Sequence, residues 1–146
     1  MFAFAYTLSG GRPLILEFTT KDTETLTQGD LLNLETGEVD LAATNDAALV
    51  GVLVSASDPA SYSSSNPAAI GAVDSTTKVK AIANEDAVYA SADANARLAG
   101  VNLDLSGATG AQTFATDSNH DFLTVVGKGA AEATLAIIAP GEHYLR

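Results

Sequence analysis

Residues that form turns recur along the whole chain at intervals of roughly 8–12 residues. The segments between these turns are short, and the longest apolar run, residues 49–54, has only the length of a strand. The chain of 146 residues is long enough for one domain with one core. The sequence therefore predicts an all-β fold, a compact β-sandwich or barrel-like domain of about ten short strands with an extended N-terminal arm.

Individual segments carry strand and hairpin signals. In residues 31–42, apolar residues alternate on both sides of a loop that contains Gly37, which predicts a hairpin. Its apolar side chains should share the buried face: Leu32, Leu34, Val39 and Leu41. The continuous run 49–54 predicts a central strand that is buried on both faces. Further strands are expected at residues 13–20, 69–73, 78–82, 103–105, 112–115, 122–126 and 134–138.

Two regions are less regular. Residues 58–67 contain two prolines among serines and asparagine, and they are expected to form the longest loop. Residues 88–98 fit either a strand or a helix, because Asn84 could cap a helix that ends at Gly100. We favour a hairpin through Tyr89 with a short helical turn near residues 94–98. The lysines at positions 78 and 80 should point to solvent.

The N-terminus has an aromatic pattern of its own. Phe2, Phe4 and Tyr6 alternate with alanines, so an extended backbone would place the three rings on one face. Gly10 and Gly11 separate this stretch from the rest, which predicts an arm at residues 1–12 and a β domain at 13–146. We expect the three rings to bind a partner by strand addition. Pairing of the arm within its own domain is the open alternative.

Charge excludes several classes of partner. Eighteen acids face seven bases, which gives a formal net charge of −11. A field of that sign repels nucleic acid and anionic membranes. No segment approaches the roughly 18 apolar residues of a membrane span, and the short apolar N-terminus lacks the basic flank of a signal peptide. Synthesis and retention in a cytoplasm, or assembly from there, are expected.

No residue cluster predicts catalysis or a cofactor. Residues 117–121 begin like a calcium loop, but Phe122 and Lys128 occupy the positions that need glycine and glutamate. There is no cysteine, and two distant histidines, His120 and His143, do not make a zinc site. The glycine-containing segment 106–110 lacks the lysine of a phosphate loop. We therefore expect no catalytic, cofactor-binding or metal-binding residues and a protein that is not an enzyme.

Three segments together resemble the head decoration (cement) proteins of tailed bacteriophages. They are residues 28–43, with Gln28-Gly29-Asp30-Leu31-Leu32 at their start, residues 49–53, and residues 103–126 with Leu103-Asp104-Leu105 and Asn119-His120-Asp121-Phe122. The resemblance spans about residues 26–139 and consists mainly of turn and strand residues.

The resemblance implies a compact β domain that forms a homotrimer. Its expected partner is the major capsid protein, which it binds on the outer surface of the virion head, and it stabilises the head by bridging capsid subunits. The alternative function is a surface adhesion or fibre module that binds a host glycan or protein.

Overall fold

The computed structural model describes residues 1–44, 46–56, 69–92, 95–116, 121–129 and 132–145. The fold is all-β, as predicted, with thirteen strands in three antiparallel sheets and no helix in the described residues. The strands are β1 (Ala3–Thr7), β2 (Ile15–Thr19), β3 (Thr25–Thr27), β4 (Leu31–Glu35), β5 (Glu38–Leu41), β6 (Leu49–Ala56), β7 (Ala69–Ala72), β8 (Lys78–Ile82), β9 (Ala87–Ser91), β10 (Asn102–Ser106), β11 (Thr113–Thr116), β12 (Phe122–Val126) and β13 (Thr134–Ile138).

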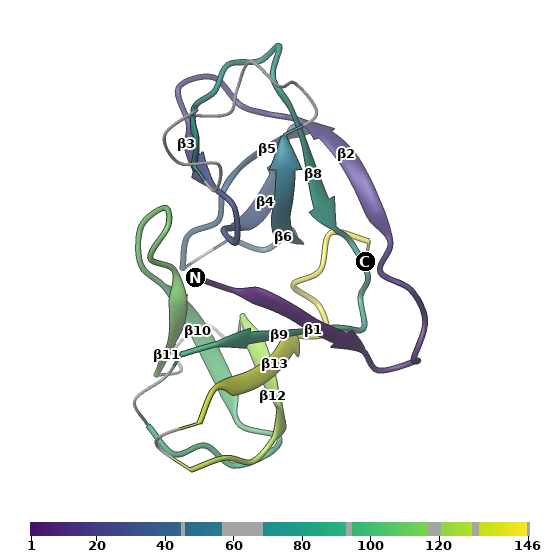
Figure 1. Cartoon of the computed structure of the whole chain (residues 1–146), viewed down its shortest axis with the longest axis vertical. Coiled ribbons are helices and arrows are strands. Elements are labelled where there is room, and N and C mark those ends of the chain that lie inside the picture. Colours follow the sequence, from purple (N-terminus) through teal and green to yellow (C-terminus); the bar gives the residue numbers. More distant parts are fainter. Residues whose placement is uncertain (45, 57–68, 93–94, 117–120, 130–131, 146) are drawn as a thin grey trace.

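The first half of the fold is a small barrel, drawn in the upper part of Figure 1. Its five strands follow the order β2-β8-β6-β4-β5. Thr20 forms a parallel bridge with Val39, and the Lys21 amide donates to the Val39 carbonyl at 2.9 Å. These contacts join the two edge strands, so the sheet closes on itself. The β3-β7 pair lies beside the barrel and contributes Leu26 and Ile70 to its core.

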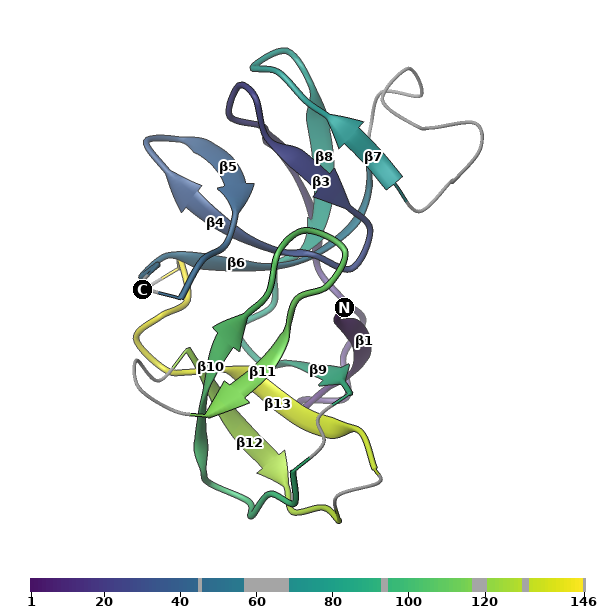
Figure 2. The same cartoon turned by 90° about the vertical axis from the view of Figure 1, so that its left-hand side faces the viewer.

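The second half is a six-stranded sheet with the order β1-β9-β13-β12-β10-β11. Five of its strands come from residues 87–138, whereas β1 comes from the N-terminus. The β8–β9 connection leads from the barrel to this sheet, and the β1–β2 connection runs beside it (Figures 1 and 2). The N-terminal strand therefore belongs to the half that the C-terminal part of the chain builds.

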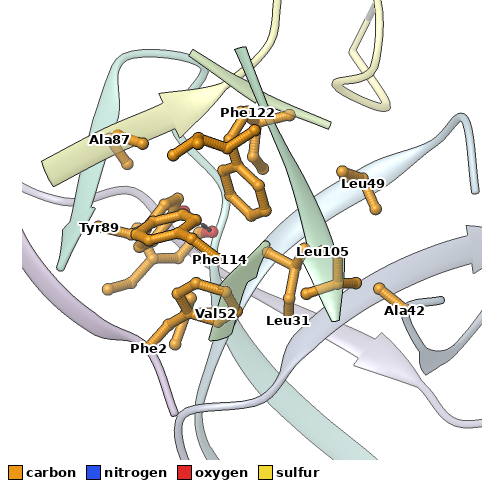
Figure 3. Packing of buried hydrophobic residues seen from close by; sticks show 14 residues of the cluster. Phe2, Leu31, Ala42, Leu49, Val52, Ala87, Tyr89, Leu105, Phe114 and Phe122 are labelled. Atoms are coloured by element: carbon orange, nitrogen blue, oxygen red, sulfur yellow. Dashed lines mark hydrogen bonds between the residues drawn. The ribbon is translucent and has the colours of Figure 1, made fainter. Parts of the chain in front are cut away.

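An aromatic cluster forms the core between the two halves (Figure 3). The rings of Phe2, Phe114 and Phe122 lie in mutual contact, with centroid distances of 4.9–5.4 Å. The barrel contributes Leu31, Ala42, Leu49, Val52 and Ile82 to the same cluster. Because apolar side chains of both halves share this cluster, their burial stabilises the joint between the halves.

The central strand and the hairpin agree with the sequence. β6 lies between β4 and β8, and of the predicted buried run 49–54 residues 49–53 are buried, whereas Val54 is partly buried. The two-residue turn Thr36-Gly37 joins β4 to β5, and both residues have positive φ, as this hairpin class requires. The four apolar residues expected on its buried face all belong to the barrel core or pack against it. Lys78 and Lys80 are exposed, as expected.

Two expectations about irregular regions have different outcomes. The short helical turn expected near residues 94–98 is wrong in its described part, residues 95–98. Arg97 exchanges two backbone hydrogen bonds with Lys128, and this antiparallel bridge holds the segment against the residues that follow β12. Tyr89 lies in a strand, β9, but the favoured hairpin through Tyr89 is wrong, because β9 pairs with β1 and β13 and not with β8. The expected loop 58–67 lies outside the described residues.

Candidate protein-binding surface

β1 occupies the edge of the six-stranded sheet and pairs with β9 of its own chain. This is the intrachain pairing that the sequence left open, and it places the expected arm within the domain. The register shifts between Phe4 and Tyr6, so a bulge interrupts the period-two pattern. As a result the three rings do not share a face. Phe2 is 3% exposed, Phe4 packs partly buried against the same core, and Tyr6 is 41% exposed.

The outer edge of β1 is suited to strand addition. Among the described residues β1 pairs with β9 alone, so one side of its backbone has no strand partner. Its sequence, Ala-Phe-Ala-Tyr-Thr, carries no charge and no proline. Charged residues and prolines commonly prevent a sheet edge from pairing with another chain, and β1 has neither. The uncharged edge is therefore available to an extended segment of another protein.

An apolar pocket of about 320 Å³ lies beside β1. Its lining includes residues 1–4 of the N-terminal segment and Val52, Leu53 and Val54 of β6. Gln28, Gly29 and Ile82 complete the lining, which contains no charged side chain. A segment that pairs with β1 could place an apolar side chain here, which would combine backbone hydrogen bonds with apolar burial.

More apolar surface follows on the connection between β1 and β2. We name residues 8–14 the strap. Every residue from Leu8 to Ile15 is exposed. Leu8, Leu14 and Ile15 are 51%, 45% and 47% exposed. The strap lies against the β8–β9 connection, where the Leu8 amide donates to the Asp86 carbonyl and Leu14 accepts from the Ala83 amide. β1, the pocket and the strap form the candidate site.

Buried polar groups hold the two halves together close to the pocket. Asp30 is fully buried and accepts from the Thr27 amide, the Gly110 amide and the Thr109 hydroxyl. Gln112 is also fully buried, accepts from the Leu31 amide at 2.6 Å and donates to the Ala42 carbonyl at 2.8 Å. The sequence did not predict the hydrogen bonds of Asp30 or Gln112, because a side chain that hydrogen-bonds to a distant backbone group leaves no local sequence pattern.

A second buried acid makes stability depend on pH. Asp121 is 1% exposed and accepts from the Leu105 amide at 2.7 Å. Burial, with the nearby carboxyls of Asp104, Glu142 and Asp46, raises the pKa of Asp121 to about 6. Between these two pKa values, Asp121 is therefore protonated in the native state but ionised in the unfolded chain, where its pKa has the ordinary value of 3.8.

We expect this group to lower the free energy of unfolding as pH rises from about 4 to above 6, by at most about 3 kcal/mol. Asp121→Asn should remove that part of the pH dependence in urea unfolding series at pH 4, 5, 6 and 7. The exposed acid variant Glu85→Gln is the matched control and should leave the slope unchanged. An Asp121→Asn slope equal to wild type would contradict the assignment.

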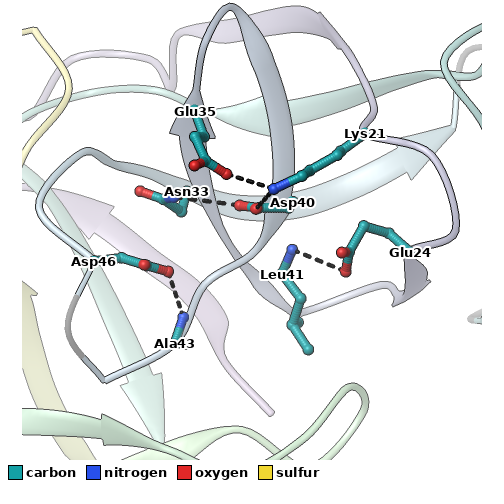
Figure 4. Close-up of polar contacts among 8 residues, drawn as sticks. All are labelled: Lys21, Glu24, Asn33, Glu35, Asp40, Leu41, Ala43 and Asp46. Atoms are coloured by element: carbon teal, nitrogen blue, oxygen red, sulfur yellow. Dashed lines mark hydrogen bonds and ion pairs between the residues drawn. The ribbon is translucent and has the colours of Figure 1, made fainter.

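Other acids lie near one lysine, Lys21, next to the contact that closes the barrel (Figure 4). Lys21 lies 2.5 Å from Glu35 and 3.3 Å from Asp40, and hydrogen bonding to Glu35 and then to Asp40 raises the pKa of Lys21. Asn33 donates to Asp40 at 3.2 Å, and Asp46 accepts from the Ala43 amide. The lysine and these donors thus offset the carboxylate charge locally.

The residues considered for metal binding are not brought together in the described part of the chain. No group of three possible ligands among His, Cys, Asp and Glu occurs there. Residues 117–120, with His120, lie outside the described residues, and His143 is buried and accepts from the Leu145 amide at 3.3 Å. We expect thermal unfolding to be the same with and without EDTA. A fall in melting temperature that calcium restores would identify a calcium loop at residues 117–121.

Comparison with known proteins finds no matching family model and no matching curated protein. The described residues also contain no helix long and apolar enough to cross a membrane.

Proposed function

We propose that this chain is a capsid decoration protein, a non-enzymatic cement that binds the outer surface of a tailed-phage head. It bridges subunits of the major capsid protein and assembles as a homotrimer. The observation that carries the proposal is the uncharged outer edge of β1 beside the apolar pocket, which fits an extended segment of a protein partner. The resemblance of residues 26–139 to decoration proteins supports the capsid protein as that partner.

The charge of the chain fits an exterior position. A net charge of −11 opposes contact with packaged DNA, so the working surface is directed to protein. Several copies that each bridge neighbouring subunits raise the cost of separating them, because linked contacts gain avidity without strong individual contacts. Tyr6 is the exposed aromatic residue of β1, and it is the best placed of the three predicted partner-binding residues to touch a capsid strand. Phe2 and Phe4 support the strand from within.

Co-sedimentation of the purified full-length chain with expanded heads that lack it tests the proposal. Wild type should bind and raise the temperature at which the heads rupture. Tyr6→Asp places a charge on the edge strand and should weaken binding about tenfold or more, the usual effect of losing an interfacial tyrosine. Val126→Asp, at another exposed apolar position, is the control and should bind like wild type.

Two outcomes oppose the proposal. Wild-type protein that does not sediment with heads contradicts capsid decoration, and binding to a host glycan or surface protein instead would favour the adhesion module. Equal binding by Tyr6→Asp and wild type would place the capsid contact away from β1.

A further inference from the structure

β1 is far along the chain from the other strands of its sheet. β1 joins the sheet built by residues 87–138, but the chain then leaves to build the barrel with residues 15–82. β1 is held by one strand, β9, by the packing of Phe2 against Phe114 and Phe122, and by the Phe2 amide, which donates to the Gly29 carbonyl at 3.0 Å. An identical copy of the chain offers β1 the same strand and the same two rings.

The strap that tethers β1 is exposed over its whole length, yet it carries apolar side chains. Five of the nine large hydrophobic residues that are exposed in the described chain belong to residues 1–15. Gly10 has a φ of +72°, and no atom lies within 4 Å of the position of an added Cβ. The strap therefore has conformational freedom at Gly10, and its exposed leucines gain from being covered.

A simple surface dimer through the strap is too small to be stable. The patch offers four half-exposed side chains, Tyr6, Leu8, Leu14 and Ile15, whereas a standard interface uses about 20–30 residues a side. The net charge of −11 on each copy also opposes contact between surfaces. Exchange of β1 overcomes both limits, because all contacts of β1 are kept and crossing straps add new ones.

We propose that copies of this chain associate by exchanging β1, so that the β1 strand of one copy completes the six-stranded sheet of the next. The occupant of the β1 position is thus a second copy, and straps that cross between copies cover Leu8, Leu14 and Ile15. The inference rests on the self-association included in the proposed function, and it adds the strand that forms the contact.

Engineered cysteines test the exchange cleanly, because the chain has no cysteine of its own. Ala3 of β1 lies opposite Ala90 of β9. Full-length Ala3→Cys and Ala90→Cys chains with different tags are co-expressed and oxidised. Exchange predicts a disulfide-linked species that contains both tags on non-reducing gels. Glu17→Cys with Lys80→Cys, opposite each other on β2 and β8, is the matched control and should give no mixed species.

A second variant tests the hinge. Deletion of Gly10 and Gly11 shortens the strap, so β1 should reach its own sheet less easily and the oligomeric share in light scattering should rise. No mixed disulfide above the control, or a shortened chain that is folded and monomeric, overturns the exchange. The head-binding assay is independent of this result. Head binding by a closed monomer would leave the decoration function standing, and exchanged oligomers that ignore heads would overturn the decoration function alone.

Discussion

Gly51→Ala will destabilise the fold by about 4 kcal/mol or more, a large fraction of the roughly 5–15 kcal/mol by which domains are stable. Gly51 has a φ of +143°, and a Cβ there would lie 1.7 Å from the Ile82 carbonyl oxygen and 2.7 Å from the Tyr89 hydroxyl oxygen. Neither neighbour can move freely. Ile82 is paired with Ile15, and the fully buried Tyr89 donates to the Ile82 carbonyl at 3.2 Å.

Urea unfolding of Gly51→Ala measures the effect, and Gly37→Ala is its matched control. Gly37 also has positive φ, +94°, but an added Cβ there meets no atom within 4 Å. The control should lose only the roughly 1–2 kcal/mol that an L-residue costs in this conformation. Similar losses at both positions would mean that backbone conformation, and not the close contact of β6 with Ile82, makes glycine necessary at position 51.

Phe2→Ala is expected to cost about 3–5 kcal/mol of unfolding free energy, the usual loss for a buried phenylalanine. Its ring contacts Phe114 and Phe122 at the joint between the halves, and it is 3% exposed. An arm at residues 1–12 that is separate from the β domain, as the sequence predicted, could lose residues 1–8 without loss of the fold. The structure predicts instead that their removal destabilises the domain, because a core ring and an edge strand leave with them.

Tyr6→Ala distinguishes the contribution of the N-terminal segment to the core from its proposed role in partner binding. Tyr6 lies on the same strand but is 41% exposed, so its loss should cost less than about 1 kcal/mol. Guanidinium unfolding of both variants gives the comparison. If Phe2→Ala unfolds at the wild-type midpoint, β1 is not docked in solution and the N-terminus is the free arm that its pattern first indicated.

Local patterns were sufficient for the class of fold and for several elements. Turn residues at short intervals predicted an all-β chain, and the run at 49–54 predicted the central strand β6. Alternation about Gly37 predicted the β4–β5 hairpin. These elements depend on residues that are close in sequence, so a reader of the sequence can identify them.

The placement of β1 was decided only by tertiary structure. Its period-two aromatic pattern suits any sheet edge, and no local signal states that Phe2 meets Phe114 or that a bulge turns Tyr6 outward. The same holds for Asp30 and Gln112, whose hydrogen bonds reach 70–81 residues along the chain.

The candidate site also has some properties that follow from the sequence and others that follow only from the tertiary structure. The sequence by itself determined the composition of β1, its lack of charge and the net charge of −11. Only the tertiary structure decided that β1 is an edge strand beside a pocket and that the strap is exposed. The physical reason is that side-chain chemistry is local, whereas an edge, a pocket and burial are made by segments that meet across the fold.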